Sequence, residues 1–177
     1  MSNKIKDFDI IESSVVKGVK IITPSVHNDE RGTLFTTFYQ DVYSELIPNG
    51  LQFKHDKFAR TIQKVLRGIH GDTKSWKLVT AVYGEITQVV VDNRVESPTY
   101  TKWEAFKISG IEPKLILLPP GVGNAFYVHS TEALYHYKLA YKGEYFDAED
   151  QFTIKWNNPE IGIEWPDMDP ILSERDK

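Results

Sequence analysis

Residues 135–142 read YHYKLAYK, and this stretch indicates the fold class. Successive side chains of a β-strand point to opposite faces of a sheet, so Tyr135, Tyr137, Leu139 and Tyr141 would share one face. The other face would carry mainly basic side chains. We therefore expect a strand with its aromatic row directed inward and its basic row directed outward.

Short apolar runs recur on both sides of this segment and are separated by Gly, Pro and Asn, which is typical of an all-β sandwich or barrel. Leu115–Leu118 is a continuous apolar run, which favours a strand buried on both faces. The runs Lys77–Tyr83 and Glu85–Asp92 flank Gly84 and predict a hairpin. One short helical turn is expected at Asp41–Leu46 with Asp41 as its N-cap. The sequence thus predicts a mainly β chain with a few short helices, in one domain spanning 1–177.

Composition excludes several classes of function. The 177 residues carry a formal net charge of −4 without a basic block, which argues against a nucleic-acid partner. The chain has no cysteine, so disulfides, thiolate catalysis and cysteine zinc sites are excluded. The first residues lack the apolar run of a signal peptide, and no stretch has transmembrane length. We expect a cytoplasmic protein with no membrane partner.

Metal and cofactor sites have little support in the pattern. None of the five histidines has another histidine two residues away, the arrangement that would place two ligands on one strand face. No phosphate-binding glycine loop, dinucleotide fingerprint or serine nucleophile elbow is present. We therefore predict no metal and no cofactor.

General acid–base chemistry remains. His70 lies between Ile69 and Gly71, and a histidine beside glycine on a strand can be approached closely by a ligand. It could equally be a histidine that lines the core and bonds a neighbour. Tyr137 could be core packing and Lys77 a solvated lysine, so the pattern alone leaves these alternatives open.

Several blocks of the chain occur in the same order in a known family. They are Asp29–Gly32, Val65–His70, Lys77–Val79, Gly84-Glu85, Val90–Asp92, Ser97–Thr99, Pro119–Gly121, Tyr137-Lys138, Ile161–Pro166 and Leu172–Asp176. On these blocks the chain resembles the dTDP-4-dehydrorhamnose 3,5-epimerase family, which has a cupin-type jelly-roll β-barrel. Gly71-Asp72 after the histidine and the segment Ala140–Tyr145 are most similar to the branch acting on GDP-4-keto-heptoses in bacterial capsule synthesis.

The resemblance implies four catalytic residues. His70 matches the general base, and Asp176 matches the carboxylate that pairs with it. Tyr137 matches the acid on the opposite face of the sugar, and Lys77 the cation near the keto oxygen. Asp176 is the penultimate residue, so its role requires the tail to dock onto the barrel.

Substrate-binding positions are implied as well. Arg67 and Arg31 match positions around the substrate and its diphosphate. Asn124 replaces a histidine of the family pattern, and Lys57 replaces an asparagine, which favours a different sugar or nucleotide. The sequence His70-Gly71-Asp72 departs from the His-x-His of metal-binding cupins. The resemblance also implies a homodimer.

The expected function is epimerisation at carbon 3, carbon 5 or both of a nucleotide-linked 4-keto sugar, most closely a GDP-4-keto-heptose. The alternatives are a dTDP-4-keto-6-deoxyhexose 3,5-epimerase, a sugar-nucleotide 3,4-ketoisomerase and a non-catalytic sugar-binding module. A metal-dependent oxygenase is a more distant possibility.

Overall fold

The computed structural model describes residues 8–177, and strands dominate this part of the chain. The strands are β1 (Phe8–Glu12), β2 (Lys20–Pro24), β3 (Val26–Asp29), β4 (Gly32–Phe35), β5 (Phe53–Ile62), β6 (Leu66–Gly71), β7 (Trp76–Tyr83), β8 (Glu85–Asp92), β9 (Trp103–Ser109), β10 (Leu115–Leu118), β11 (Val122–Val128), β12 (Glu132–Ala140) and β13 (Phe152–Thr153). The helical segments are α1 (Gln40–Ser44) and the 3-10 turn η2 (Asp147–Asp150). The expectation of a mainly β chain is confirmed.

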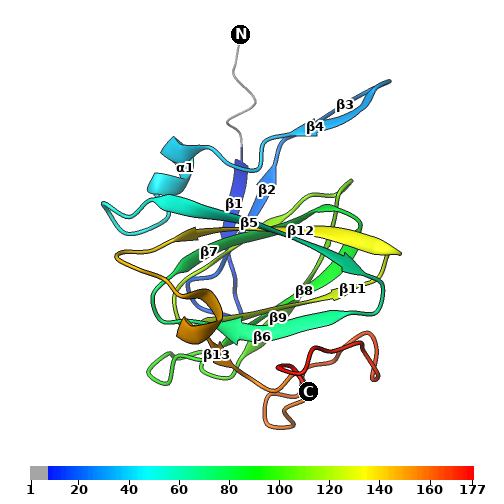
Figure 1. Ribbon diagram of the computed structural model, residues 1–177. Helices are drawn as coiled ribbons and strands as arrows, with labels where there is room; N and C mark the ends of the chain where they lie inside the picture. The colour runs from blue at the N-terminus through cyan, green and yellow to red at the C-terminus, as the bar shows by residue number, and fades with distance from the viewer. Residues whose placement is uncertain (1–7) are drawn as a thin grey trace.

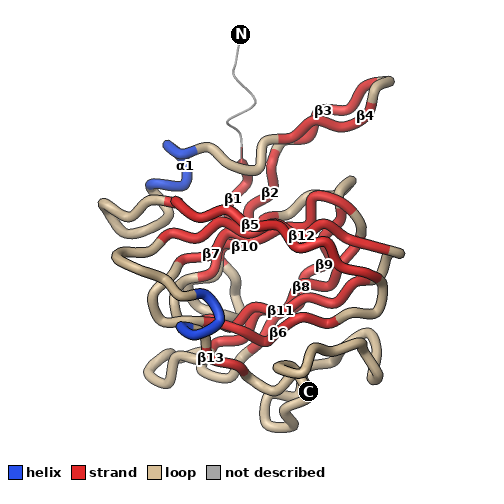
Figure 2. Tube along the Cα trace, viewed as in Figure 1, coloured by secondary structure: helices blue, strands red, loops and turns tan. Residues whose placement is uncertain are grey.

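Two antiparallel sheets face each other (Figures 1 and 2). The six-stranded sheet has the order β1-β2-β10-β7-β12-β5, and the five-stranded sheet has the order β13-β6-β11-β8-β9. This is a jelly-roll type of arrangement, but within residues 8–177 the sheets do not close into one continuous hydrogen-bonded barrel. Strands β3 and β4 form a separate hairpin that projects from the body (Figure 1).

The core lies between the two sheets and is built from their inward rows. Val79 of β7, Ile86 of β8, Phe126 of β11 and Tyr135 of β12 belong to one buried cluster. Burial of each large apolar side chain contributes about 1.5–3 kcal/mol. All four residues of Leu115–Leu118 are buried, which confirms the expectation for that run.

The alternation expected over residues 135–142 is confirmed for the inward row and is wrong at two positions of the outward row, His136 and Ala140, which are both buried. Tyr135 and Leu139 are buried on the inner face. His136 faces the other way but is also buried, because its ring stacks on Phe58 of the neighbouring strand with 4.5 Å between centroids. The strand ends at Ala140, before the last two residues of the pattern.

Two local expectations are wrong. Strands β7 and β8 do not pair as a hairpin, since they belong to different sheets and Gly84 carries the chain across between them. Gly84 has φ +80, and a Cβ there would lie 2.3 Å from the carbonyl oxygen of Glu132, so a side chain does not fit. Asp41 lies inside the first turn of α1, and the N-cap is Tyr39.

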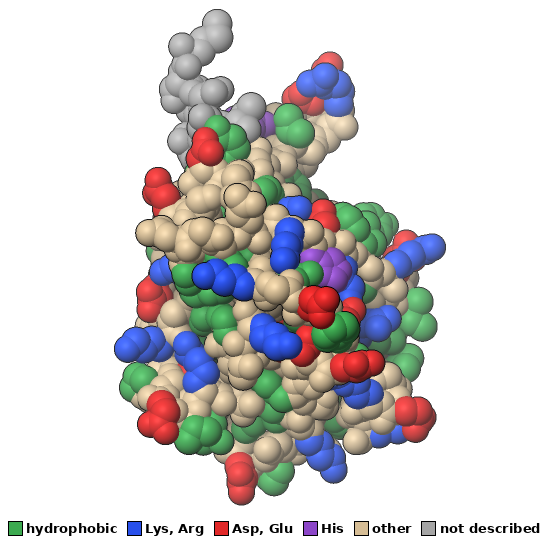
Figure 3. Space-filling model, turned by 60° about the vertical axis from the view of Figure 1, so that its left-hand side comes forward, with side chains coloured by type: hydrophobic (Ala, Val, Ile, Leu, Met, Phe, Trp, Pro, Cys, Tyr) green, Lys and Arg blue, Asp and Glu red, His purple; other side chains and the backbone are tan. Residues whose placement is uncertain are grey.

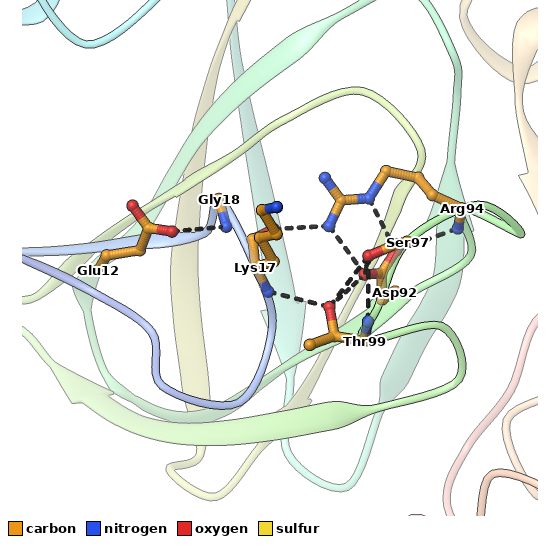
Figure 4. Close-up of polar contacts among 7 residues, drawn as sticks. All are labelled: Glu12, Lys17, Gly18, Asp92, Arg94, Ser97 and Thr99. Atoms are coloured by element: carbon orange, nitrogen blue, oxygen red, sulfur yellow. Dashed lines mark hydrogen bonds and ion pairs between the residues drawn. The ribbon is translucent and has the colours of Figure 1, made fainter.

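The block Ser97–Thr99 has a structural use at the end of β8 (Figure 4). The buried Asp92 carboxylate accepts hydrogen bonds from Arg94 Nε at 2.7 Å and from the hydroxyls of Ser97 and Thr99, each at 2.6 Å. Arg94 Nη2 and Thr99 Oγ1 in turn bond the backbone of Lys17. Asp92 therefore ties the loop after β8 to the loop between β1 and β2.

We expect Asp92→Asn to lower the free energy of unfolding by about 2 kcal/mol at pH 7. Burial by itself raises the pKa of the Asp92 carboxyl, but the hydrogen bonds from Arg94, Ser97 and Thr99 outweigh it and lower this pKa to about 2. A carboxyl whose pKa is lowered on folding stabilises the folded state at pH values above its ordinary pKa of about 3.9. This contribution is lost as the pH falls to about 2. Urea unfolding at pH 7 and pH 2.5 measures this, and an equal difference between wild type and variant at both pH values would contradict it.

Within residues 8–177, no helix has the length and apolar character needed to cross a membrane.

Candidate active site

A cavity of about 330 Å³ opens between the two sheets. Its lining includes six of the eight residues that the sequence predicted for the site: Arg67, His70, Lys77, Asn124, Tyr137 and Asp176. The five-stranded sheet supplies Arg67 and His70 from β6 and Asn124 from β11. The six-stranded sheet supplies Lys77 from β7 and Tyr137 from β12.

His70 and Asp176 form a hydrogen-bonded pair. His70 Nε2 lies 2.6 Å from Asp176 Oδ1, and Ser173 Oγ donates to Asp176 Oδ2 at 2.8 Å. The tail that carries Asp176 docks against the start of β6, where Ile171 accepts a hydrogen bond from the backbone of Leu66 and pairs with Val65. The docking that the role of Asp176 required is therefore present.

The pairing determines which ring nitrogen of His70 is free. Burial by itself raises the pKa of the Asp176 carboxyl, but the hydrogen bonds from His70 and Ser173 outweigh it, so the pKa is lowered. An ionised carboxylate only accepts, so Nε2 of His70 carries the shared hydrogen. Nδ1 is then the ring nitrogen with a lone pair, and Asp176 also stabilises the ring once it is protonated.

Lys77 has a buried counter-charge that the sequence analysis did not identify. Its Nζ lies 2.8 Å from Asp72 Oδ2, and the two side chains are 8% and 0% exposed. Asp72 also accepts from Ser75 Oγ at 2.7 Å and from the hydroxyl of Tyr145 at 3.2 Å. Burial opposes ionisation of Asp72, but Lys77 and Ser75 lower its pKa overall. A fixed ammonium therefore reaches the cavity wall.

Tyr137 lies on the sheet opposite His70. In register it neighbours Val79 of β7 and Lys57 of β5, and its ring packs edge-on against Tyr135 with 5.5 Å between centroids. Lys57 is not among the residues that line the cavity. Its Nζ lies 5.5 Å from the centre of the Tyr137 ring and pairs with Asp147 of η2, which does line the cavity.

The two predicted arginines lie in different places. Arg67 lines the cavity and its Nε donates to Thr61 Oγ1 at 3.1 Å. Arg31 follows β3 at the tip of the projecting hairpin, where its side chain is 84% exposed and pairs with Asp29. The structure does not bring Arg31 to the cavity of its own chain.

The described residues contain no group of three or more His, Asp or Glu side chains placed to hold a metal ion. On the face shown in Figure 3, Lys and Arg side chains alternate with Asp and Glu, without the continuous basic surface typical of nucleic-acid binding.

Sequence reasoning missed six polar residues at the site: Asp72, Tyr145, Asp147, Gln151, Ser173 and Arg175. Asp72 follows His70 by two residues and occupies the position of the second histidine in the His-x-His motif of metal-binding cupins. An acidic residue at this position was the signal that could have identified it. Ser173 lies in the matching block Leu172–Asp176, but no strand or helix period singles it out, and Tyr145 likewise reaches the cavity from a loop.

The arrangement suits proton transfer on both sides of a bound molecule. An imidazole with a carboxylate partner lines one wall, a phenol lines the opposite wall, and an ammonium is available to stabilise negative charge.

Comparisons with known proteins agree with this chemistry. A family model described as dTDP-4-dehydrorhamnose 3,5-epimerase matches residues 13–177. The chain is 34% identical to dTDP-4-dehydrorhamnose 3,5-epimerase of Salmonella typhimurium, over 94% of this chain and 92% of that protein. It is 33% identical to dTDP-4-dehydrorhamnose 3-epimerase of Streptomyces niveus, over 92% of this chain and 78% of that protein.

Among solved structures, the chain is similar to dTDP-6-deoxy-D-glucose-3,5-epimerase of Legionella pneumophila in complex with dTDP-4-keto-L-rhamnose. The TM-score is 0.86 and the identity 34%, covering 96% of this chain and 90% of that chain. Because the family model spans nearly the whole sequence and these relatives exceed 30% identity, this chain belongs to the dTDP-4-dehydrorhamnose 3,5-epimerase family, a family of isomerases.

Proposed function

We propose that this chain inverts carbon 3, carbon 5 or both of a nucleotide-linked 4-keto sugar. The observation that carries the proposal is the placement of His70 and Tyr137 on opposite walls of one cavity, each contributed by a different sheet. A sugar ring lying between the sheets would present one face to the imidazole and the other to the phenol.

The proposed reaction needs no redox step. His70 removes the proton from the carbon beside the ketone, and the electron pair of the broken C–H bond moves into the carbonyl to form an enolate. Lys77 stabilises the negative oxygen electrostatically. Tyr137 then donates its proton to the opposite face of the same carbon, and the configuration is inverted. The tyrosinate and the imidazolium return to their starting states by proton exchange with water.

The proposed substrate is a dTDP-4-keto-6-deoxyhexose. The relatives described above are named for dTDP-linked sugars. A GDP-4-keto-heptose is the second candidate. It is favoured by the departures at Asn124 and Lys57: Asn124 lines the cavity, and Lys57 lies beside the Tyr137 ring and pairs with the cavity residue Asp147.

We expect dTDP-4-keto-6-deoxy-D-glucose to gain deuterium at carbon 3, carbon 5 or both when it is incubated with the protein in deuterated water. Proton NMR of the product locates each exchanged carbon and its configuration. A parallel incubation with a GDP-4-keto-heptose ranks the two substrates. No exchange with either would contradict the proposed function, and a shifted ketone would identify a 3,4-ketoisomerase instead.

We also propose that the chain acts as a homodimer. Strand β5 ends the order of the six-stranded sheet, so one of its edges lacks a strand partner among residues 8–177. The hairpin β3–β4 projects from the body (Figure 1), so Arg31 can contact a substrate only in the cavity of a second copy. Light scattering during gel filtration should give twice the chain mass of 20.4 kDa; the single-chain mass would contradict this.

A further inference from the structure

A buried chain of hydrogen bonds crosses the core and ends at the cavity. It joins Gln88 of β8, Tyr135 of β12 and Asn124 of β11. Gln88 and Tyr135 are both 0% exposed, whereas Asn124 lines the cavity. The proposed chemistry does not use Gln88. A fully buried amide is costly unless its hydrogen-bonding groups are satisfied, so its partners are of interest.

The donor and the acceptor of each of these buried hydrogen bonds follow from the chemical groups that take part. Gln88 Nε2 lies 3.1 Å from the carbonyl oxygen of Val89, which can only accept, so this end of the amide is the nitrogen. The opposite end, Oε1, accepts from the Tyr135 hydroxyl at 2.7 Å. The second hydrogen of Nε2 is therefore available for Asn124 Oδ1, at 2.6 Å.

Asn124 is oriented as a consequence. Its Oδ1 accepts from Gln88 Nε2 at 2.6 Å. The Tyr135 hydroxyl also lies 3.1 Å from this oxygen, but its one hydrogen is donated to Gln88 Oε1 at the shorter distance of 2.7 Å, so the Gln88 bond orients the Asn124 amide. No buried side-chain nitrogen or oxygen within the described part of the chain lacks a partner, so the NH₂ group is open to the cavity.

The open NH₂ group stands beside the proposed base. Asn124 is paired in register with His70 across β11 and β6, and directly opposed side chains of an antiparallel pair have Cβ atoms about 5 Å apart. A ligand that displaces water from the cavity would have to offer this NH₂ group an acceptor, since an unsatisfied polar group is costly.

We infer that Gln88 is a positioning residue that holds the Asn124 amide with its NH₂ group toward the substrate. The sugar oxygen beside the carbon that faces His70 must then accept a hydrogen bond from this NH₂ group. The assignment of that oxygen to a 4-keto sugar rests on the proposed function. A neutral histidine, which the family pattern has at this position, could donate or accept. The locked amide only donates, and it thereby restricts which sugars fit.

Gln88→Glu tests this inference with little change of shape. Full burial disfavours ionisation of the introduced carboxyl, so kcat/KM is measured at rising pH; once ionised, the carboxylate cannot donate to Asn124 Oδ1, and the Asn124 amide should reverse and turn its oxygen toward the sugar. We expect kcat/KM for dTDP-4-keto-6-deoxy-D-glucose to fall about 10- to 100-fold, which is the effect of one misdirected buried hydrogen bond. Gln88→Met removes the Gln88 hydrogen bond but leaves the Tyr135 hydroxyl near Asn124, so its loss should be smaller.

The matched control is Thr80→Val. Thr80 is 1% exposed and donates to the carbonyl oxygen of Lys114 at 2.7 Å, on the side of β7 away from the cavity residue Val79. This variant also loses one buried hydrogen bond, so urea unfolding should show a comparable loss of stability without a change in kcat/KM. A role of Gln88 in stability alone would instead make the rate follow stability in all three variants.

A second measurement does not depend on catalysis. In ¹⁵N-labelled protein, the side-chain NH₂ signal of Asn124, identified by its absence in Asn124→Asp, should shift when the dTDP-sugar is added to wild type. In Gln88→Glu, or in Gln88→Met if the first variant does not fold, the shift should be reduced. Equal shifts, or equal kcat/KM, would overturn the inference and leave the proposed function standing. A shift without any deuterium exchange in wild type would instead overturn the proposed function alone.

Discussion

His70→Asn should abolish deuterium uptake at both carbons, with a loss of at least about 10³-fold in kcat. The asparagine keeps a polar group of similar reach but has no basic nitrogen, and a positioned general base typically contributes 10²–10⁴-fold. The loss should lie toward the upper end because the same base would serve each carbon that is inverted. Solvent-deuterium exchange followed by NMR measures both carbons in one experiment.

The matched control for this variant is His129→Asn. His129 follows β11, accepts or donates a hydrogen bond with Thr87 at 2.7 Å, and does not line the cavity. Its replacement should leave the exchange rate unchanged. The fold of His70→Asn should persist, since Asp176 keeps the hydroxyl of Ser173 as a partner. Full activity of His70→Asn would remove the proposed base.

Tyr137→Phe should lower the rate of inversion about 10²- to 10³-fold while proton abstraction continues. The variant keeps His70, Asp176 and Lys77, so the enolate still forms, but no acid remains on the opposite wall of the cavity. Deuterium should then enter with retention of configuration, because reprotonation occurs from the side of His70. If only one of the two carbons depends on Tyr137, inversion of the other will be spared.

Tyr141→Phe is the control for this second variant. Tyr141 lies just beyond β12, its hydroxyl is 3.5 Å from His55 Nδ1, and it is not part of the cavity wall. It should behave as wild type. Parallel loss of deuterium uptake and inversion in Tyr137→Phe would show that the tyrosine acts before the enolate forms, contrary to the proposed order.

Local pattern was sufficient for much of the fold. The alternation at Tyr135–Leu139 and the apolar run Leu115–Leu118 identified buried strand faces, because side-chain direction in a strand depends only on position along it. Local pattern also predicted a hairpin between β7 and β8, and this prediction is wrong. Pairing of strands is decided by contacts between distant segments, and a turn at Gly84 can lead either to a hairpin or to the other sheet.

For the active site, too, the sequence predicted some features and not others. Resemblance in sequence supplied the identities of His70, Lys77 and Tyr137, and the cavity brings these three residues together. It also predicted Arg31 and Lys57 at the substrate. Within one chain Arg31 lies on a projecting hairpin and Lys57 pairs with the cavity residue Asp147, so these two roles stay predictions. Motifs record which residue types occur and in what order, but they do not record the hydrogen bonds that each side chain makes.

Periodicity and composition were enough to predict a mainly β chain, most of its buried strand faces and the residue types available for acid–base chemistry. Folding in three dimensions was needed to place His70 and Tyr137 on opposite walls, to pair Asp72 with Lys77, and to carry Asp176 on the tail to His70. The physical reason is that strand direction and burial follow a local period, while pairing across sheets and docking of a tail depend on the packing of segments up to 106 residues apart.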